Sequence, residues 1–208
     1  MTRARAPRAR YRVTLLVRMA MTVCSRAPLP VNPLPSRPCA CSGVSNHEID
    51  DLKRVQAVAT KPIACNQFET HPYYQRAELL EYCVANDIAV TAHSSMGGEN
   101  NAMKAFHASP PLTDDPTLQA IAKKHGTSTH LVLLAWGLQR PTAIIPKSVT
   151  PARIRSNLED VLAISLDADD LAAIAALDKP GLEGCYCHPK TPWLGRSEFT
   201  GSTDHYYG

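Results

Sequence analysis

The sequence predicts an α/β protein built from parallel β/α units. From residue 43 to about residue 180, short apolar runs with strand character alternate with stretches whose apolar residues recur at helical spacing. Such alternation is typical of a parallel sheet with helices packed on it. No internal sequence repeat accompanies it.

The first helix is expected directly after Ser45 or Asn46, since either residue is a good N-cap. Its apolar positions recur at near-helical spacing: Ile49, Leu52, Val55 and Val58. Pro62 ends this helix, and residues 63–67 follow as a short buried strand.

The second helix is expected to open at Pro72 and Tyr73 and to end near Asn86. Its inward-facing positions are Ala77, Leu80 and Cys83. Residues 88–92 form the next predicted strand. A long loop follows it and passes through Gly97, Gly98, Pro110 and Pro111.

Two helices precede the last predicted strand. Asp115 is expected to cap a short helix from Pro116 to His125, which Gly126 closes. The helix from Ser128 to Gln139 is apolar around most of its surface, so it is expected to be buried.

The stretch from residue 143 to residue 157 is expected to combine a buried strand end at 143–145, a tight polar turn and the start of a helix. Thr150 is a suitable N-cap, and Pro151 fits the first helical position. Lys147 and Ser148 lie just past the strand, where they can face the free N–H groups of the helix. Oriented amides, a cation and a hydroxyl make an anion site, and phosphate is its natural guest.

Arg153, one turn into this helix, can add a second cation or lie flat on an aromatic ring. The alternative for the whole stretch is an ordinary strand-to-helix turn with solvated Lys and Arg side chains. Asp167 then starts a last helix, whose inward positions are Leu171, Ile174 and Leu177. Residues 181–208 are expected to form a C-terminal loop.

Residues 1–42 differ in composition from the rest and are expected to form a disordered Arg/Pro-rich leader. They hold eight Arg and no Lys, Asp or Glu, whereas the other 166 residues carry 14 basic and 19 acidic side chains. The apolar run 11–23 is interrupted by Arg12 and Arg18, so it is too short and too charged to span a bilayer.

Several interpretations of this leader stay open. One is a disordered segment or the start of a misread gene. An acid-free, Arg-rich start also fits a mitochondrial transit peptide and, less well, a secretory signal. Nucleic-acid binding by the Arg run is disfavoured because no aromatic platform accompanies it.

The seven Cys residues are odd in number and irregularly spaced, which indicates a reducing compartment rather than a disulfide framework. The segment 185–188, Cys-Tyr-Cys-His, invites a metal site. It lacks a fourth ligand and the usual ligand spacing, so no metal is expected.

Five segments resemble, in order, the signature segments of the aldo-keto reductase family. They are GVSN at 43–46, NQFETHPY at 66–73, VTAHS at 90–94, LLAWGLQR at 133–140 and IIPKSVTPARIRSN at 144–157. The resemblance covers residues 43–180 and implies a (β/α)8 TIM barrel, of which this chain supplies strands five to eight with their helices. Such a half-barrel would have two open sheet edges. An isolated chain is therefore expected to fold poorly, to self-associate through these edges or to borrow a partner half.

The resemblance also implies NADPH as the cofactor, bound at the carboxyl ends of the strands. Ser45, Asn46 and Gln67 would hydrogen-bond the nicotinamide carboxamide. His93 stands where the family usually has Tyr, whose ring stacks on the nicotinamide. Ser94 and Met96 would contact the pyrophosphate; these six residues form the expected nicotinamide end.

At the other end, Lys147, Ser148 and Val149 would hold the adenosine 2′-phosphate, with Arg153 on the adenine face and Asn157 at its edge. Cations here favour NADPH over NADH. Ser156 replaces the family's usual Glu, which puts one adenosine contact in doubt.

Purely structural roles stay open for several of these residues. Ser45 and Asn46 could simply cap a helix, and Gln67 could be a satisfied buried amide. His93 could be a core histidine. Glu69 and the nearby His71 are expected to brace the strand-to-helix turn.

Catalysis in the family relies on a Tyr acid with Lys, Asp and His, all from the first half of the barrel. Residues 1–42 contain only Tyr11 of these types, so no catalytic residue is assigned. The expected function is NADPH-dependent reduction of aldehyde or ketone carbonyls in the cytoplasm, by a chain that lacks this tetrad. The alternatives are a non-catalytic half-barrel that binds a dinucleotide or protein partner, and a gene fragment without function.

Overall fold

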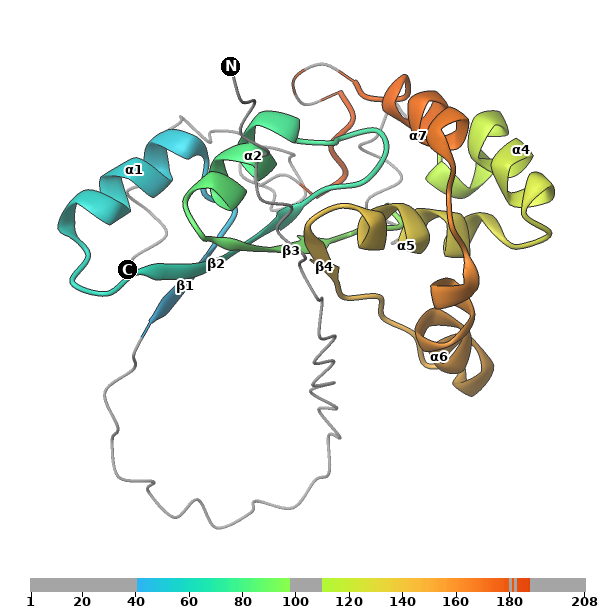
Figure 1. The fold of residues 1–208 in the computed structure, drawn as a ribbon, viewed down its shortest axis with the longest axis horizontal. Coiled ribbons are helices and arrows are strands. Elements are labelled where there is room, and N and C mark those ends of the chain that lie inside the picture. Colours follow the sequence, from blue (N-terminus) through green and yellow to red (C-terminus); the bar gives the residue numbers. More distant parts are fainter. Residues whose placement is uncertain (1–40, 98–109, 180, 182, 188–208) are drawn as a thin grey trace, which may run out of the picture. The chain divides into compact units, whose positions relative to one another are not determined.

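A parallel sheet organises the part of the chain that the structure describes. The computed structural model describes residues 41–97, 110–179, 181 and 183–187 (Figure 1). Its strands are β1 (Ser42–Ser45), β2 (Ile63–Glu69), β3 (Ala89–His93) and β4 (Thr142–Ile144). They form one four-stranded sheet in the order β1-β2-β3-β4, and every neighbouring pair is parallel. The predicted α/β class with a parallel sheet is therefore confirmed.

Helices follow the strands in the alternating order that the sequence predicts. They are α1 (Ile49–Val58), α2 (Ala77–Ala85), α4 (Pro116–Lys124), α5 (Thr129–Gln139), α6 (Pro151–Leu158) and α7 (Ala168–Ala175). Two 3-10 turns, η1 (Leu112–Asp114) and η2 (Asp160–Ala163), join them. Among the described residues, no helix is long and apolar enough to cross a membrane.

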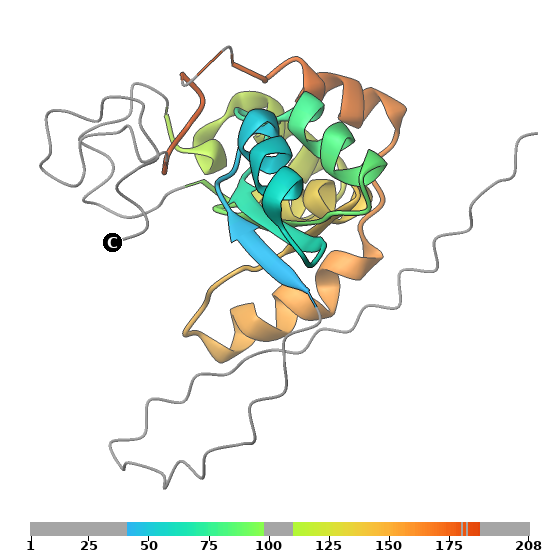
Figure 2. The same ribbon diagram turned by 90° about the vertical axis from the view of Figure 1, so that its left-hand side faces the viewer.

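Two apolar clusters hold the helices in place. In the first, α1 and α2 cover β2 and β3 through contacts among Leu52, Phe68, Leu80 and Val90. These two helices lie side by side on one face of the sheet in both views (Figures 1 and 2). The second cluster surrounds α5, which is buried from Val132 to Gly137, as its all-round apolar sequence predicts.

Within the described residues, the opposite face of the sheet presents side chains that are exposed or half-buried, and we call it the bare face. Side chains alternate along a strand, so the neighbours of the helix-facing Val44, Phe68, Val90 and Ile144 point away from the helices. The bare face comprises Gly43, Ser45, Cys65, Gln67, Thr91, His93, Ala143 and Ile145, all exposed or half-buried. Ile145 is 51% exposed, which is unusual for a large apolar residue beside a sheet.

Two predicted helix starts are wrong. Helix α1 is capped by Glu48 and a reciprocal bond with Asp51, because Ser45 still belongs to β1 and Asn46 turns with φ 56°. Its last residue, Val58, is 81% exposed rather than inward.

Helix α2 begins at Ala77 rather than at Pro72. His71 and Tyr74 exchange backbone hydrogen bonds of 3.2 and 2.8 Å, and this closed turn cannot also be helical. Arg76 then takes φ 53° before the helix starts. The consequence is that Ala77 is exposed and the buried positions are Leu79, Leu80 and Cys83.

The predicted strand end before the polar turn is not buried. Ile144 is half-buried and Ile145 is exposed because β4 is an outer strand of the sheet within the described residues. Helix α6 likewise buries no residue.

The remaining helix starts are as predicted: Asp115, Ser128, Thr150 and Asp167 are the N-caps of α4, α5, α6 and α7. Strand β1 begins at Ser42, one residue before the predicted domain start. By contacts, the chain divides into residues 1–38 and 39–208. Residues 1–40, nearly all of the predicted leader, lie outside the described residues, as do residues 188–208 of the predicted C-terminal loop.

Asp115 supports a quantitative prediction about stability. Its carboxylate accepts hydrogen bonds from the backbone N–H of Thr117 and Leu118 at 2.9 and 3.1 Å, and from the buried Tyr73 hydroxyl at 2.6 Å. Burial, and then the nearby Asp115 carboxylate, raise the pKa of Tyr73. Asp115→Ala should lower the free energy of unfolding by about 2–4 kcal/mol, since it removes a cap and leaves a buried hydroxyl without its acceptor.

The matched control is Ser128→Ala, which removes the side-chain cap of α5 at an exposed position and should cost about 1 kcal/mol. Denaturant unfolding at one fixed protein concentration measures both. Equal losses for the two variants would show that the Tyr73 contact adds nothing.

Candidate functional site

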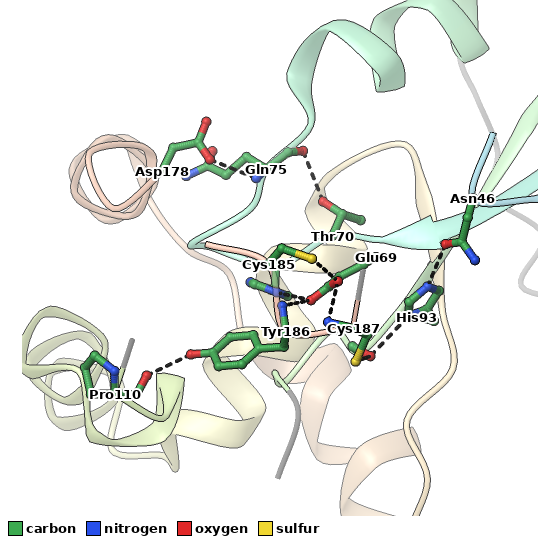
Figure 3. Close-up of polar contacts among 12 residues, drawn as sticks. Asn46, Glu69, Thr70, Gln75, His93, Pro110, Asp178, Cys185, Tyr186 and Cys187 are labelled. Carbon is green, nitrogen blue, oxygen red and sulfur yellow. Dashed lines mark hydrogen bonds and ion pairs between the residues drawn. The ribbon is translucent and has the colours of Figure 1, made fainter. Parts of the chain in front are cut away.

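Polar side chains from β1 and β3 meet at the carboxyl edge of the sheet (Figure 3). His93 ends β3, and its Nε2 lies 3.1 Å from Oδ1 of Asn46, the residue after β1. Its Nδ1 lies 3.1 Å from the hydroxyl of Ser94. Ser45 donates to the backbone carbonyl of Gln67 at 2.9 Å and lies 3.3 Å from Nδ2 of Asn46. The structure thus brings together four residues that were predicted for the nicotinamide end.

The partners of His93 determine which of its nitrogens carries the proton. Oδ1 of Asn46 can only accept, so Nε2 donates to it and Nδ1 accepts from the Ser94 hydroxyl. Burial, the largest effect, lowers the pKa of His93; the charge of Glu69 opposes this and that of His71 adds to it.

Two residues in left-handed backbone conformations flank this histidine. Asn46 has φ 56° and Ser94 has φ 53°. Asn adopts this region readily, whereas for Ser it costs on the order of 1 kcal/mol. Both residues turn the chain directly after a strand, which directs their side chains toward His93.

The other two residues predicted for this end are placed differently. Gln67 lies on the bare face in β2, half-buried, and within the described chain its side-chain amide makes no hydrogen bond. It is therefore free to bind a ligand. Met96 is half-buried and packs against the apolar cluster around α5.

The predicted phosphate end lies on the turn between β4 and α6. Lys147, Val149 and Arg153 are exposed, whereas Ser148 and Asn157 are half-buried. Neither Lys147 nor Arg153 forms an ion pair with another described residue. Within the described residues, no hydrogen bond or ion pair joins these side chains to the group around His93. The two groups both follow carboxyl ends of strands of the sheet.

The N-terminus of α6 is open. Thr150 holds the N-cap position, but its side chain accepts no hydrogen bond from the helix, in contrast to Asp115, Ser128 and Asp167. Ser148 instead accepts from the backbone N–H of Thr150 at 3.2 Å. Uncapped amides beside exposed cations favour an anion at this position.

A buried carboxylate, Glu69, adds a feature that sequence reasoning missed. It ends β2 and is 3% exposed. The expected brace to His71 exists at 2.9 Å. The same carboxylate also accepts from the backbone N–H of Tyr186 at 2.6 Å and of Cys187 at 2.9 Å, and from the Cys185 thiol at 3.0 Å. We call residues 184–187 the strap; three of its residues contact Glu69 at the end of β2 (Figure 3).

The strap lies tightly against the turn after β2. A Cβ added to Gly184 would come 1.7 Å from the backbone oxygen of Tyr73, so only glycine fits there. The Tyr186 ring lies 4.9 Å from the His71 ring, and its hydroxyl donates to the carbonyl of Pro110 at 2.7 Å. No local pattern signals these contacts, because more than 110 residues separate Glu69 from the strap.

Among the described residues, no group of three His, Cys, Asp or Glu side chains could hold a metal ion. Within the Cys-Tyr-Cys-His segment, the Cys185 thiol donates to Glu69, and His188 lies outside the described residues.

A family model described as "Aldo/keto reductase family" matches residues 39–179. The chain belongs to the aldo/keto reductase family. The resemblance carried by the five sequence segments is thereby confirmed, and the match includes every strand of the sheet.

Two curated relatives each match about two thirds of the chain. The chain is 40% identical over 137 residues to an NADP-dependent D-sorbitol-6-phosphate dehydrogenase of Malus domestica, covering 66% of this chain and 44% of the relative. It is 38% identical over 140 residues to aldo-keto reductase family 1 member C3 of Homo sapiens, covering 66% and 43%.

Solved structures of the family share the fold. An aldo-keto reductase in complex with NADPH matches with a TM-score of 0.59 at 34% identity, over 65% of this chain and 41% of that one. An aldose reductase from Giardia lamblia matches with a TM-score of 0.56 at 35% identity, over 65% and 43%. The chain thus spans 41–44% of the length of these two relatives and two structures. Which of the barrel's strands these four are stays a prediction.

The pKa of Glu69 gives a test of its role. Burial alone would raise this pKa, but hydrogen bonds from His71, Cys185 and Tyr186 and the His71 charge outweigh it and lower the pKa from 4.5 to about 2. A carboxyl group whose pKa is lower in the folded than in the unfolded chain stabilises the folded state at pH values above its pKa in the unfolded chain. This stabilisation, on the order of 3 kcal/mol, should decline as the pH falls from about 4.5 toward 2.

Unfolding of the wild-type chain and of Glu69→Gln should be compared between pH 7 and pH 3. The stability difference between them should be constant above pH 5 and shrink below it. A difference that does not change with pH would show that the ionised carboxylate does not hold the strap.

Proposed function

We propose that this chain forms the dinucleotide-binding half of an NADPH-dependent carbonyl reductase. The open N-terminus of α6 beside Lys147 and Arg153 carries this proposal. A 2′-phosphate distinguishes NADPH from NADH, and it requires cations and hydrogen-bond donors where a bare ribose does not. Lys147 would supply a point charge, Ser148 and the α6 amides would donate hydrogen bonds, and Arg153 would lie against the adenine.

The group around His93 would bind the nicotinamide. Ser45, Asn46 and Gln67 offer the paired donors and acceptors that a carboxamide needs. The His93 ring would take the stacking position. NADPH, when bound, supplies the hydride for reducing an aldehyde or ketone; the chain's own residues bind and orient the dinucleotide.

We further propose that the chain alone does not turn over substrate. A ketone oxygen must be protonated as hydride arrives, and a Tyr with a pKa near 10 needs charged neighbours to do this at neutral pH. The 42 residues before the family-like region contain Tyr11 but no Lys, Asp or His to assist it. Coupled assays with aldehydes and NADPH should therefore show negligible turnover, and robust NADPH-dependent reduction would overturn this part.

Binding tests the first part. Titration with NADPH, followed by its fluorescence, should give a Kd that rises about 10- to 100-fold in Lys147→Ala/Arg153→Ala, because two charge-assisted contacts to the nucleotide are lost. NADH should bind more weakly to the wild-type chain and lose less affinity in this variant, because it lacks the 2′-phosphate and keeps only the contact between Arg153 and the adenine.

The control pair is Lys53→Ala/Arg54→Ala, which removes two exposed cations from α1. It should leave both affinities unchanged. Equal affinity of the wild-type chain for NADPH and NADH would contradict the proposed 2′-phosphate site.

A second proposal rests on the bare face. A parallel sheet normally has both faces covered, yet here eight residues on one face are exposed or half-buried. We propose that a second copy of the chain covers this face, with β4 of each copy beside β1 of the other. That arrangement is closed and two-fold symmetric and leaves no open edge.

Ile145→Lys should shift the chain toward monomers in analytical ultracentrifugation, because it places a charge on the proposed contact. Val58→Lys is the matched control, since Val58 is also exposed and apolar but lies on α1. A wild-type chain that is a monodisperse monomer with sharp cooperative melting would refute the proposal.

A further inference from the structure

We propose that Glu69 is a positioning residue for the nicotinamide end of the site, acting through the strap on His93. This inference rests on the proposed function for the role of His93, but the contacts from which it is argued are present without a bound nucleotide.

The first step is the set of hydrogen bonds that the Glu69 carboxylate accepts from the strap. Two of its four donors are main-chain N–H groups, those of Tyr186 and Cys187. A carboxylate bound to consecutive amides fixes the position of the backbone as well as that of a side chain. Because the carboxylate is buried, losing the strap would leave it with fewer donors at a high desolvation cost.

The second step is the contact that these hydrogen bonds create. Cys187 Sγ lies 3.2 Å from the hydroxyl of Ser94, which lies 3.1 Å from Nδ1 of His93. Nε2 of His93 lies 3.1 Å from Asn46, and the Asn46 amide lies 3.3 Å from Ser45. We call this series the relay; it runs from the strap through His93 to β1.

The third step is the direction of the relay. Nε2 must donate to Asn46, so Nδ1 accepts the Ser94 proton, and Ser94 is left to accept from the Cys187 thiol. Each donor of the relay then has one acceptor. The relay ends at Ser45, whose hydroxyl donates to the backbone carbonyl of Gln67. The strap therefore supplies the donor that keeps Ser94 turned toward His93.

Packing holds the first part of the strap, Gly184 to Tyr186, in place. A Cβ on Gly97 would lie 3.2 Å from Leu112 and 3.3 Å from the Tyr186 ring, so the loop after β3 fits closely between them. Gly184 is confined more closely, against Tyr73. Because packing holds Gly184 and Tyr186, we expect release of the Glu69 contacts to act mainly at Cys187, whose backbone N–H the carboxylate binds, and to displace Cys187 from Ser94.

Four variants separate these steps. Glu69→Gln removes the carboxylate that binds the strap, Cys187→Ala removes only the thiol, Cys187→Ser restores a donor, and Glu81→Gln is a control on an exposed carboxylate of α2. The readouts are hydrogen exchange at the Tyr186 and Cys187 amides, the imidazole ¹⁵N shifts of His93, and NADPH affinity. His93→Gln assigns the His93 signals.

We expect Glu69→Gln to exchange the Tyr186 and Cys187 amide hydrogens faster and to change the imidazole ¹⁵N shifts of His93. Cys187→Ala should change the His93 shifts without faster amide exchange. Cys187→Ser should restore them, and Glu81→Gln should change nothing. NADPH affinity should fall about 5- to 20-fold in Glu69→Gln, within the usual range of coupling between sites. If Glu69→Gln does not fold, Gly184→Ala displaces the strap with Glu69 intact and should move the same signals.

Unchanged His93 shifts in both the strap-releasing variant and Cys187→Ala would overturn the proposal. So would tighter NADPH binding on release, because the strap would then be blocking the site. If the wild-type chain does not bind NADPH, the proposed function fails, but the His93 shifts still decide whether Glu69 positions this ring.

Discussion

A buried carboxylate holds the carboxyl edge of the sheet together. Glu69 ends a central strand, and its four donors come from His71 and from the strap, which is more than 110 residues away in the sequence. Burying such a charge is costly unless the donors are present together, so the turn after β2 and the strap behave as one unit. The loop after β3 joins them through the contact between Cys187 and Ser94. In our proposal the geometry of the candidate site depends on this carboxylate, although none of the residues it binds is among those predicted to bind NADPH.

The bare face connects the fold to its chemistry. Helices cover one side of the four strands, and the other side presents Gln67 and His93 next to small residues that would leave room for a ligand. In a closed barrel such a face is interior. The same face leaves Ile145 exposed, and within the described residues β1 and β4 are outer strands of the sheet. Binding of the dinucleotide and covering of this face are therefore expected to stabilise one another.

Sequence alone predicted what is locally encoded. The helix starts at Asp115, Ser128 and Asp167 follow from short-range hydrogen bonds, and the buried α5 follows from its apolar surface. The start of α2 was mispredicted because a closed turn at His71 and Tyr74 outweighed the helix signal of Pro72. At the site, family signatures indicated Asn46, His93 and Ser94, but not the strap, which depends on pairing between distant segments. The exposure of Ile145 was not predicted either, because an apolar run is found both in buried strands and in outer strands of a sheet.

The most direct test of the account is a crystal structure of this chain soaked with NADPH. We expect the 2′-phosphate to lie among Lys147, Ser148 and the N-terminus of α6, with the nicotinamide ring against His93. Density for the nucleotide elsewhere, or a 2′-phosphate that points into solvent away from this turn, would contradict it.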